Sequence, residues 1–326
     1  MVTKTFLVMM ISFILSLITG SILIPILKNH ANQRLSIYLS VRHKDKKNTP
    51  TMGGLIFVIS TLLTFILLLL FKKIEMSNGL LIIIFTFISY ALIGFIDDYL
   101  IIKRNNNKGL KEYQKLLLQL LVSVIFFLIF MLDNEPLLWI HTFHLKLNIG
   151  WFYGLFILLV LVSSSNAVNL TDGLDGLATG LSIIAFITFG ILSYNTGWLN
   201  GYEDIGLFSF ILVGSLLGFL FFNSYPAKIF MGDTGSLSLG ALLGSYAILT
   251  RHELLLIVIG IVFVIETLTC VIQRTYYKFT KKRILPMTPI HHTFEKMGFK
   301  ESDIVKMFWV LGLIGSMVAL GFGVWL

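Results

Sequence analysis

The sequence predicts an all-α, polytopic integral membrane protein, and two observations lead to that prediction. Of the 326 residues, 56% are hydrophobic and only 13% are charged, with a mean hydropathy of +0.87. A water-soluble domain of this size does not need so much apolar surface, whereas a protein surrounded by lipid does. Ten apolar runs also approach the length that a helix needs to cross a hydrocarbon layer of about 30 Å, some with help from flanking residues.

The apolar runs follow one another along the whole chain, without a soluble domain or an internal repeat. The first run is too long for the core of a signal peptide, so we expect it to be retained as a span. The ten expected transmembrane helices are 6–27, 52–71, 79–96, 116–132, 151–165, 177–194, 205–222, 235–250, 254–273 and 306–325. We therefore expect one transmembrane domain, 1–326, with 274–306 as its longest segment between spans.

The distribution of basic residues orients the predicted bundle. Segments 28–50, 97–115, 223–234 and 274–306 lie on one side and contain 20 of the 25 Lys and Arg residues. Because Lys and Arg are enriched in cytoplasmic loops, this side is predicted to be cytoplasmic and both termini extracytoplasmic. The net charge of +8 then reflects membrane orientation, with membrane lipids and no nucleic acid as partners. The single cysteine, Cys270, excludes a disulfide framework.

Acidic residues also gather at the predicted cytoplasmic face, where three separate loops meet spans. They are Asp97, Asp98, Asp172, Asp175 and Asp233. The acids of the opposite face are expected in ordinary polar loops, and they are Asp133, Glu135, Glu203, Asp204 and Glu253. Because polar groups near the hydrocarbon layer are costly, the cytoplasmic set predicts an active site on that face.

Asp97 and Asp98 are expected at the end of the third span. Adjacent carboxylates repel each other and burial makes ionising both more costly, so a divalent cation or a role as general base would account for them. The alternative is a plain helix end neutralised by Lys103 and Arg104. The helix dipole argues against that alternative, because acids are unfavourable at a helix C-terminus.

The stretch from Asn166 to Gly176 combines amides, acids and glycines between two apolar runs. Asp172 and Asp175 are three residues apart, so they would face one way on a helical turn. The glycines allow close backbone approach, which suits a phosphate, a sugar or a metal. The alternative is a connector in which Thr171 or Asp172 caps the next helix.

A second glycine-containing stretch, 230–236, places Asp233 between Gly232 and Gly235. It suits a phosphate bound through backbone N–H groups, with Asp233 reaching a metal. The alternative is that Asp233 only caps the eighth span. No Gly-Lys-Ser/Thr follows, so this is not a Walker loop.

The last cytoplasmic segment contains His291 and His292 after two prolines. Adjacent histidines do not easily chelate one ion, so contacts with a phosphorylated ligand are favoured over zinc. Lysines 44, 46 and 47 before the second span suit either anionic lipid headgroups or the site. Glu266 in the ninth span is predicted to be functional or to face the bundle, with no partner identifiable from the sequence.

These motifs together resemble the phospho-N-acetylmuramoyl-pentapeptide transferase (translocase I) family, within the polyprenyl-phosphate N-acetylhexosamine-1-phosphate transferases. The matching segments occur in order over essentially the whole chain, and they are 49–54, 95–99, 166–176, Asn223, 230–236 and 289–295. The resemblance implies transfer of phospho-MurNAc-pentapeptide from UDP-MurNAc-pentapeptide to undecaprenyl phosphate, giving lipid I and UMP with Mg²⁺. This is the first membrane step of peptidoglycan synthesis, in the bacterial cytoplasmic membrane. The family commonly has three consecutive histidines, and here the third position is Thr293.

The resemblance also implies roles for individual residues. Asp233 would bind Mg²⁺, Asp97 would be the base, Asp98 would orient the base or the metal, and His291 would be catalytic. The implied substrate-binding residues are Lys46, Thr51, Lys115, Asn166, Asn169, Asp172, Asp175, Asn223, Phe230, Gly232 and His292. Direct attack and an aspartyl nucleophile both remain open, as does a homodimer.

Two other functions are compatible with parts of the sequence. A polyprenyl-phosphate GlcNAc-1-phosphate transferase would share most motifs, although the segment 289–295 favours the muramoyl branch. An ion-coupled transporter would fit ten spans and Glu266. However, its binding residues would lie near the bilayer midplane, whereas the acids gather at one face.

Overall fold

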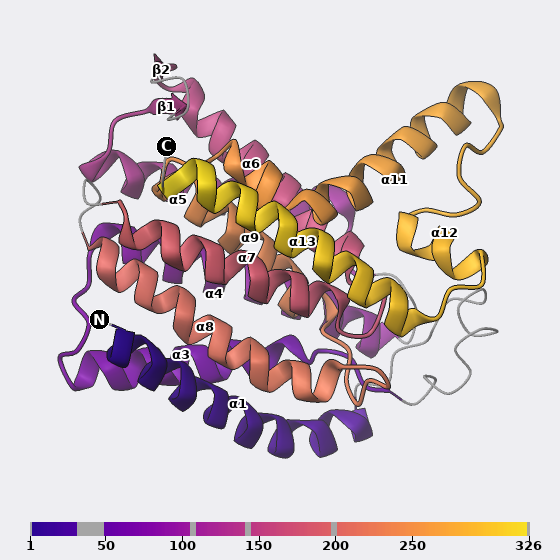
Figure 1. Cartoon of the computed structure of the whole chain (residues 1–326), viewed down its shortest axis with the longest axis horizontal. Coiled ribbons are helices and arrows are strands. Elements are labelled where there is room, and N and C mark those ends of the chain that lie inside the picture. Colours follow the sequence, from indigo (N-terminus) through magenta and orange to yellow (C-terminus); the bar gives the residue numbers. More distant parts are fainter. Residues whose placement is uncertain (1, 31–48, 105–108, 141–144, 197–200, 325–326) are drawn as a thin grey trace.

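The computed structural model describes residues 2–30, 49–104, 109–140, 145–196 and 201–324. Its regular secondary structure is helical apart from one two-stranded hairpin (Figure 1). The helices are α1 (Val2–His30), α3 (Gly54–Leu70), α4 (Asn78–Arg104), α5 (Glu112–Asp133), α6 (Phe152–Thr171), α7 (Leu177–Tyr194), α8 (Tyr202–Asn223), α9 (Gly232–Leu249), α10 (Leu255–Ile259), α11 (Ile261–Thr280), α12 (Ile290–Lys296) and α13 (Glu301–Val324). The strands are β1 (Leu137–Ile140) and β2 (Leu145–Asn148).

Seven helices of the described chain are long and apolar enough to cross a membrane, namely α1, α4, α5, α6, α7, α8 and α13. The prediction of an all-helical, polytopic membrane protein is therefore confirmed in its main point. The other three predicted spans are also helical but differ in character. Helix α3 has only 17 residues, α9 contains four glycines and three serines, and α11 ends in a charged turn. Ten spans therefore stay a prediction.

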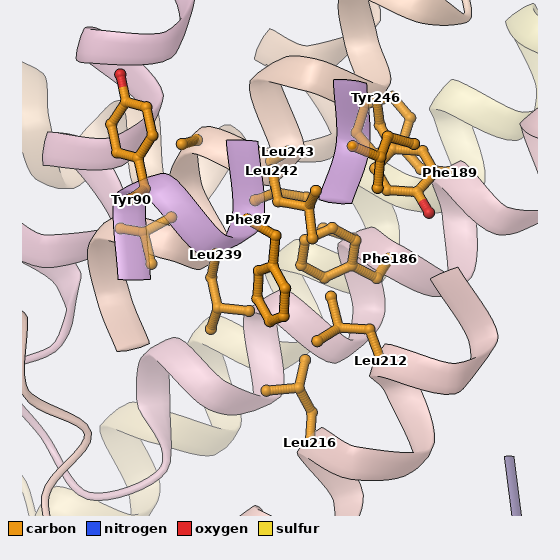
Figure 2. Packing of buried hydrophobic residues seen from close by; sticks show 14 of the residues in the cluster. Phe87, Tyr90, Phe186, Phe189, Leu212, Leu216, Leu239, Leu242, Leu243 and Tyr246 are labelled. Carbon is orange, nitrogen blue, oxygen red and sulfur yellow. The ribbon is translucent and has the colours of Figure 1, made fainter. Parts of the chain in front are cut away.

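Helix α9 lies at the centre of the bundle, where every residue from Thr234 to Leu249 is buried. The rings of Phe186 and Phe189 on α7 lie beside Tyr246 of this helix, with ring centroids 5.9 and 6.0 Å from its own (Figure 2). Its backbone also approaches its neighbours closely. A Cβ on Gly94 of α4 would lie 2.1 Å from the carbonyl oxygen of Asp233, and one on Gly54 of α3 would lie 2.3 Å from the nitrogen of Gly235. Small residues permit this close helix contact, which explains why the most buried helix is not the most apolar.

The predicted span 254–273 is broken at Gly260 into α10 and α11. A Cβ on Gly260 would lie only 2.9 Å from the carbonyl oxygen of Leu256, so the tight junction suits glycine. Helix α11 then continues to Thr280, and its outer half projects from the bundle (Figure 1). The segment 274–306 is thus partly helical at both ends, since α13 begins at Glu301. Its central part contains α12 with the His pair.

The opposite end of the bundle carries the β1–β2 hairpin, which the sequence analysis did not predict. The start of α1 and the end of α13 lie at this same end (Figure 1). Beneath the hairpin, Arg251 donates hydrogen bonds to the carbonyl oxygens of Leu137 and Glu135, and Tyr153 donates to Glu253 at 2.7 Å. The expectation that Glu253 sits in an ordinary polar loop is wrong, because it is 5% exposed. Burial raises the pKa of its carboxyl to about 7.

Candidate active site

Asp98 caps helix α9 from a neighbouring helix. Its carboxylate accepts hydrogen bonds from the backbone nitrogens of Asp233 (3.1 Å) and Thr234 (2.9 Å), and from the Thr234 hydroxyl (2.7 Å). These donors belong to the first turn of α9, whose N–H groups have no partners inside the helix. Asp98 therefore fixes where Asp233 stands. The alternative in which Asp233 itself caps α9 is wrong, because Asp98 supplies the carboxylate.

Asp97 and Asp98 were expected at a helix end, and that expectation is also wrong. Helix α4 continues past them to Arg104, which stands with Lys103 in the last turn where cations are favourable. The two acids lie on a buried part of the helix, each 5% exposed. Successive residues of a helix point in different directions, so Asp98 meets α9 while Asp97 meets the start of α5.

Lys115 joins two of the predicted site acids. Its ammonium group lies 2.8 Å from Oδ2 of Asp233 and 3.4 Å from Oδ1 of Asp97. Asp97 also accepts a hydrogen bond from the backbone nitrogen of Leu110 at 2.8 Å. On the other side of Asp233, the amide of Asn169 donates to Oδ1 at 2.8 Å. Four predicted residues from α4, α5, α6 and α9 are thus connected in one chain of polar contacts.

Asp172 follows directly after α6 and faces the same cluster. Burial raises the pKa of its carboxyl from 3.8 to about 7, and the negative charges of Asp233, Asp98 and Asp175 add to that rise. A backbone hydrogen bond from Gly232 opposes the rise. The carboxyl therefore stands in a region where negative charge accumulates beyond what Lys115 can neutralise.

The turn between α6 and α7 is not helical, and its cap differs from the predicted one. Asp172 and Asp175 are not on a helix, so their spacing does not make them face one way. The N-cap of α7 is Gly176, at φ +80°, and neither Thr171 nor Asp172 caps that helix. A positive φ strongly favours glycine, which accounts for Gly176 at this point.

Two motifs that are far apart in the sequence form one wall beside the cluster. The backbone nitrogens of Gly53 and Gly54 donate to the carbonyl oxygens of Phe230 and Met231, each at 2.8 Å. A Cβ on Gly232, at φ +74°, would lie 2.7 Å from Asp98 and 2.9 Å from the Thr51 hydroxyl oxygen. Thr51, Phe230 and Gly232 are therefore brought close together in the fold.

Three predicted binding residues bond to nearby protein groups. The Asn223 amide donates to the carbonyl of Ile229 and accepts from Thr179, so it holds the loop after α8. Asp175 accepts from the nitrogen of Ala227 in the same loop at 2.9 Å. The amide of Asn166 donates to Val162 within α6. Lys46 lies outside the described residues.

The histidine segment is built from two carboxylate–imidazole pairs. Nδ1 of His291 lies 3.1 Å from the carboxylate of Glu266, and both side chains are fully buried. His292 pairs with Glu295 at 2.6 Å within α12. Thr293 donates to the carbonyl of Met287 and accepts from its nitrogen, so its hydroxyl holds the backbone before α12. The partner of Glu266 that the sequence could not identify is therefore His291.

Comparison with known proteins identifies the family. The chain matches glycosyl transferase family 4 over residues 80–251 and signature 1 of the phospho-N-acetylmuramoyl-pentapeptide-transferases over residues 46–58. It is 45% identical to the phospho-N-acetylmuramoyl-pentapeptide-transferase of Staphylococcus saprophyticus, across 98% of this chain and 99% of that protein. The enzyme of the same name from Staphylococcus epidermidis is 44% identical, with the same two coverages. The chain belongs to the phospho-N-acetylmuramoyl-pentapeptide-transferase family.

For a transferase of this family, the question is whether the side chains around Asp233 could hold Mg²⁺. No three His, Cys, Asp or Glu side chains within the described ranges form a closed metal cage. Mg²⁺ usually takes only one or two carboxylates and completes its shell with phosphate oxygens and water. The acids around Asp233, whose charges add to the burial that raises the pKa of Asp172, suit a divalent cation of that kind.

Several residues of this transferase site were missed by sequence reasoning. The Ser236 hydroxyl accepts from Asn169 at 2.8 Å, Thr234 bonds to Asp98, and Glu301 accepts from the nitrogen of Asp175 at 2.7 Å. The two hydroxyl residues, Thr234 and Ser236, lie near the start of α9, within the recognised motif 230–236. Glu301 begins α13, and nothing in its local sequence connects it with residue 175.

Proposed function

We propose that this protein transfers phospho-MurNAc-pentapeptide from UDP-MurNAc-pentapeptide to undecaprenyl phosphate, releasing UMP and forming lipid I. One observation carries the assignment of the site: Lys115 bridges Asp97 and Asp233 while Asn169 holds the other oxygen of Asp233. This arrangement places one cation and two acids from three helices around a single point. Phosphoryl transfer depends mainly on positioning and on neutralising charge, which such an arrangement can supply.

The donor diphosphate would lie against Lys115 and the 230–236 turn. Lys115 offers a point positive charge. Gly232 lets the 230–236 turn pack closely against Asp98 and Thr51, where a side chain would collide. Asp175 and Asn223 would act on the nucleoside indirectly, since they hold the loop 224–231 that leads to Phe230. Phe230 would then be available to stack on uracil.

Asp97 is the better placed of the adjacent acids to act as base. Asp98 is committed to three donors at the start of α9, whereas Asp97 stands beside Lys115. Asp97 would take the proton from the phosphate of undecaprenyl phosphate, and the phosphate oxygen would attack the donor phosphorus. An aspartyl nucleophile would use the same residue, and release of UMP without the lipid acceptor would reveal that route.

Asp233 would hold Mg²⁺, together with phosphate oxygens of the donor. The bound ion would neutralise charge on the diphosphate and on the departing UMP. Each neighbouring residue would have a different role. Asn169 orients the Asp233 carboxylate, Asp98 fixes the start of α9 that carries Asp233, and Lys115 balances the charge of Asp233. Removing Mg²⁺ with a chelator should abolish UMP release, and adding Mg²⁺ back should restore it.

The site would lie at the cytoplasmic surface of a ten-span protein with both termini outside. Two observations support this orientation. Most Lys and Arg residues lie in the segments of one side, and the start of α1 and the end of α13 lie at the end of the bundle away from α12 (Figure 1). A cysteine at position 300, in a Cys270→Ser background, should resist impermeant maleimide in intact cells. Ready labelling from outside would reverse the orientation. A homodimer stays a prediction.

The decisive experiment supplies purified protein in detergent with UDP-MurNAc-pentapeptide, undecaprenyl phosphate and Mg²⁺, and measures UMP and lipid product. A parallel reaction with UDP-GlcNAc tests the related donor. We expect UMP release that requires both substrates and a strong preference for the muramoyl donor. A protein that uses only UDP-GlcNAc, or releases no UMP with either donor, would refute the proposed function.

A further inference from the structure

A buried pair of ionisable residues stands apart from the acid cluster. Glu266 and His291 are both 0% exposed, and their nearest charged atoms, Oε2 and Nδ1, are 3.1 Å apart. Among the described residues, neither carboxylate oxygen and neither ring nitrogen makes a well-aligned hydrogen bond. Burying such groups without full compensation costs stability. A pair that is kept under these conditions is therefore a candidate for function.

The location of Glu266 strengthens this reading. Only Val262, Phe263 and Glu266 are buried among the residues of α11, because the helix leaves the bundle soon afterwards. Glu266 thus occupies the last buried turn and faces α12, which carries His291. The pair connects α11 to α12, the segment in which the family resemblance implies a catalytic histidine.

The opposite side of the His291 ring touches the acid-bearing turn. A Cβ on Gly173 would lie 2.3 Å from Nε2 of His291, so the ring packs directly against the glycine backbone. Gly173 follows Asp172, whose carboxyl faces Asp233. The imidazole is therefore held between a carboxylate at Nδ1 and the edge of the proposed diphosphate site at Nε2.

We propose that Glu266 is a positioning residue that fixes the buried His291 ring against the Asp172–Gly173 turn, so that the pair sets where this edge of the proposed diphosphate site stands. With Nδ1 turned to the carboxylate at 3.1 Å, the orientation of the ring is set. The inference rests on the proposed transferase function and adds Glu266 and Gly173 to its machinery.

The test measures kcat, donor KM and thermal stability for variants on both sides of the ring. Glu266→Gln keeps the shape and removes the charge, so kcat should fall about 10- to 100-fold with donor KM within about threefold. Glu266→Asp should recover part of the loss. Gly173→Ala pushes the ring from the other side and should reproduce the same kcat defect.

Matched controls separate positioning from general destabilisation. Thr269→Val removes a hydroxyl that bonds to the Glu266 backbone carbonyl, one turn along α11, and should keep wild-type kcat. Gly321→Ala is the control for Gly173→Ala, because it adds a methyl group where nothing lies within 4 Å, and it should also keep wild-type kcat. In a double-variant cycle, Glu266→Gln combined with His291→Gln should be no slower than His291→Gln alone, because the two residues act as one unit.

Clear outcomes would overturn the proposal. Wild-type kcat in Glu266→Gln would do so, as would losses that multiply in the double variant. If Glu266→Gln fails to fold, Glu266→Asp and Gly173→Ala carry the test, and normal kcat in both would refute it. Failure of the proposed function is separate, because it would show as absent UMP release by the wild-type protein.

Discussion

The Asp172 carboxyl should weaken the free protein at neutral and alkaline pH, and Asp172→Asn should relieve that weakness. Burial and the neighbouring acids raise its pKa from 3.8 to about 7. Below pH 3.8 the carboxyl is neutral in the folded and unfolded chains, so nothing is lost. Between pH 3.8 and 7 the unfolded chain ionises first, and folding stability falls. Above pH 7 the loss is complete, at about 4 kcal/mol.

Asparagine cannot ionise, so the variant should escape this loss. For a protein of this size, about 4 kcal/mol corresponds to a rise in Tm of roughly 5–15 °C at pH 8. At pH 5 the rise should be about a third as large, because the carboxyl has lost only that share of stability. The five tryptophans allow Tm to be followed by intrinsic fluorescence in detergent with a chelator present.

The matched control is Asp303→Asn on α13, where the acid is 58% exposed and only 4.0 Å from Lys306. Its Tm should change by no more than about 2 °C at either pH, as exposed ion pairs contribute little. The reasoning about Asp172 would be refuted if Asp172→Asn had an unchanged Tm at pH 8. A rise of equal size at pH 5 and pH 8 would refute it as well, because an ionisation effect must grow with pH over that range.

Three further substitutions probe the remaining assignments. Asp97→Asn should lower turnover by about 10²- to 10⁴-fold while leaving nucleotide binding nearly unchanged, and weakened binding of the nucleotide would argue against a base. Asp98→Ala should reduce both Tm and activity, because it removes the cap of α9 that fixes Asp233; loss of activity with wild-type Tm would instead indicate a direct chemical role. Thr293→Ala should cost stability through the Met287 backbone with little effect on turnover per folded molecule, and an enzyme as inactive as His291→Ala would contradict that.

The helices and the acid cluster could be predicted because they follow from local sequence. Apolar runs of spanning length locate the helices, and acids beside glycine turns locate the site. The break at Gly260 could not be predicted, since a single glycine is also tolerated inside an unbroken helix. The β1–β2 hairpin was missed because its two strands have only four residues each, too few for an alternation that would separate them from a loop between spans.

Residue roles within the cluster depend on contacts between distant segments, and the sequence contains little information about those. Asp97 and Asp98 are adjacent and chemically identical, yet one caps α9 and the other meets Lys115. The direction of each side chain on α4 and the distance to α9 decide this difference. In the same way, the sequence marked Glu266 as unusual but could not connect it with His291, 25 positions later on another helix.

The contacts around Asp233 explain why such a polar site can exist in an apolar bundle. Asp98, Asn169 and Lys115 belong to three different helices, and each contributes a bond to Asp233 or to the turn that holds it. Small residues bring α4 close enough for Asp98 to reach the end of α9, so helix packing and site geometry have one cause. A larger residue at Gly94 would move α4 away from Asp233 and thereby displace the cap. The glycines of this bundle are therefore as necessary to the proposed chemistry as the acids that would perform it.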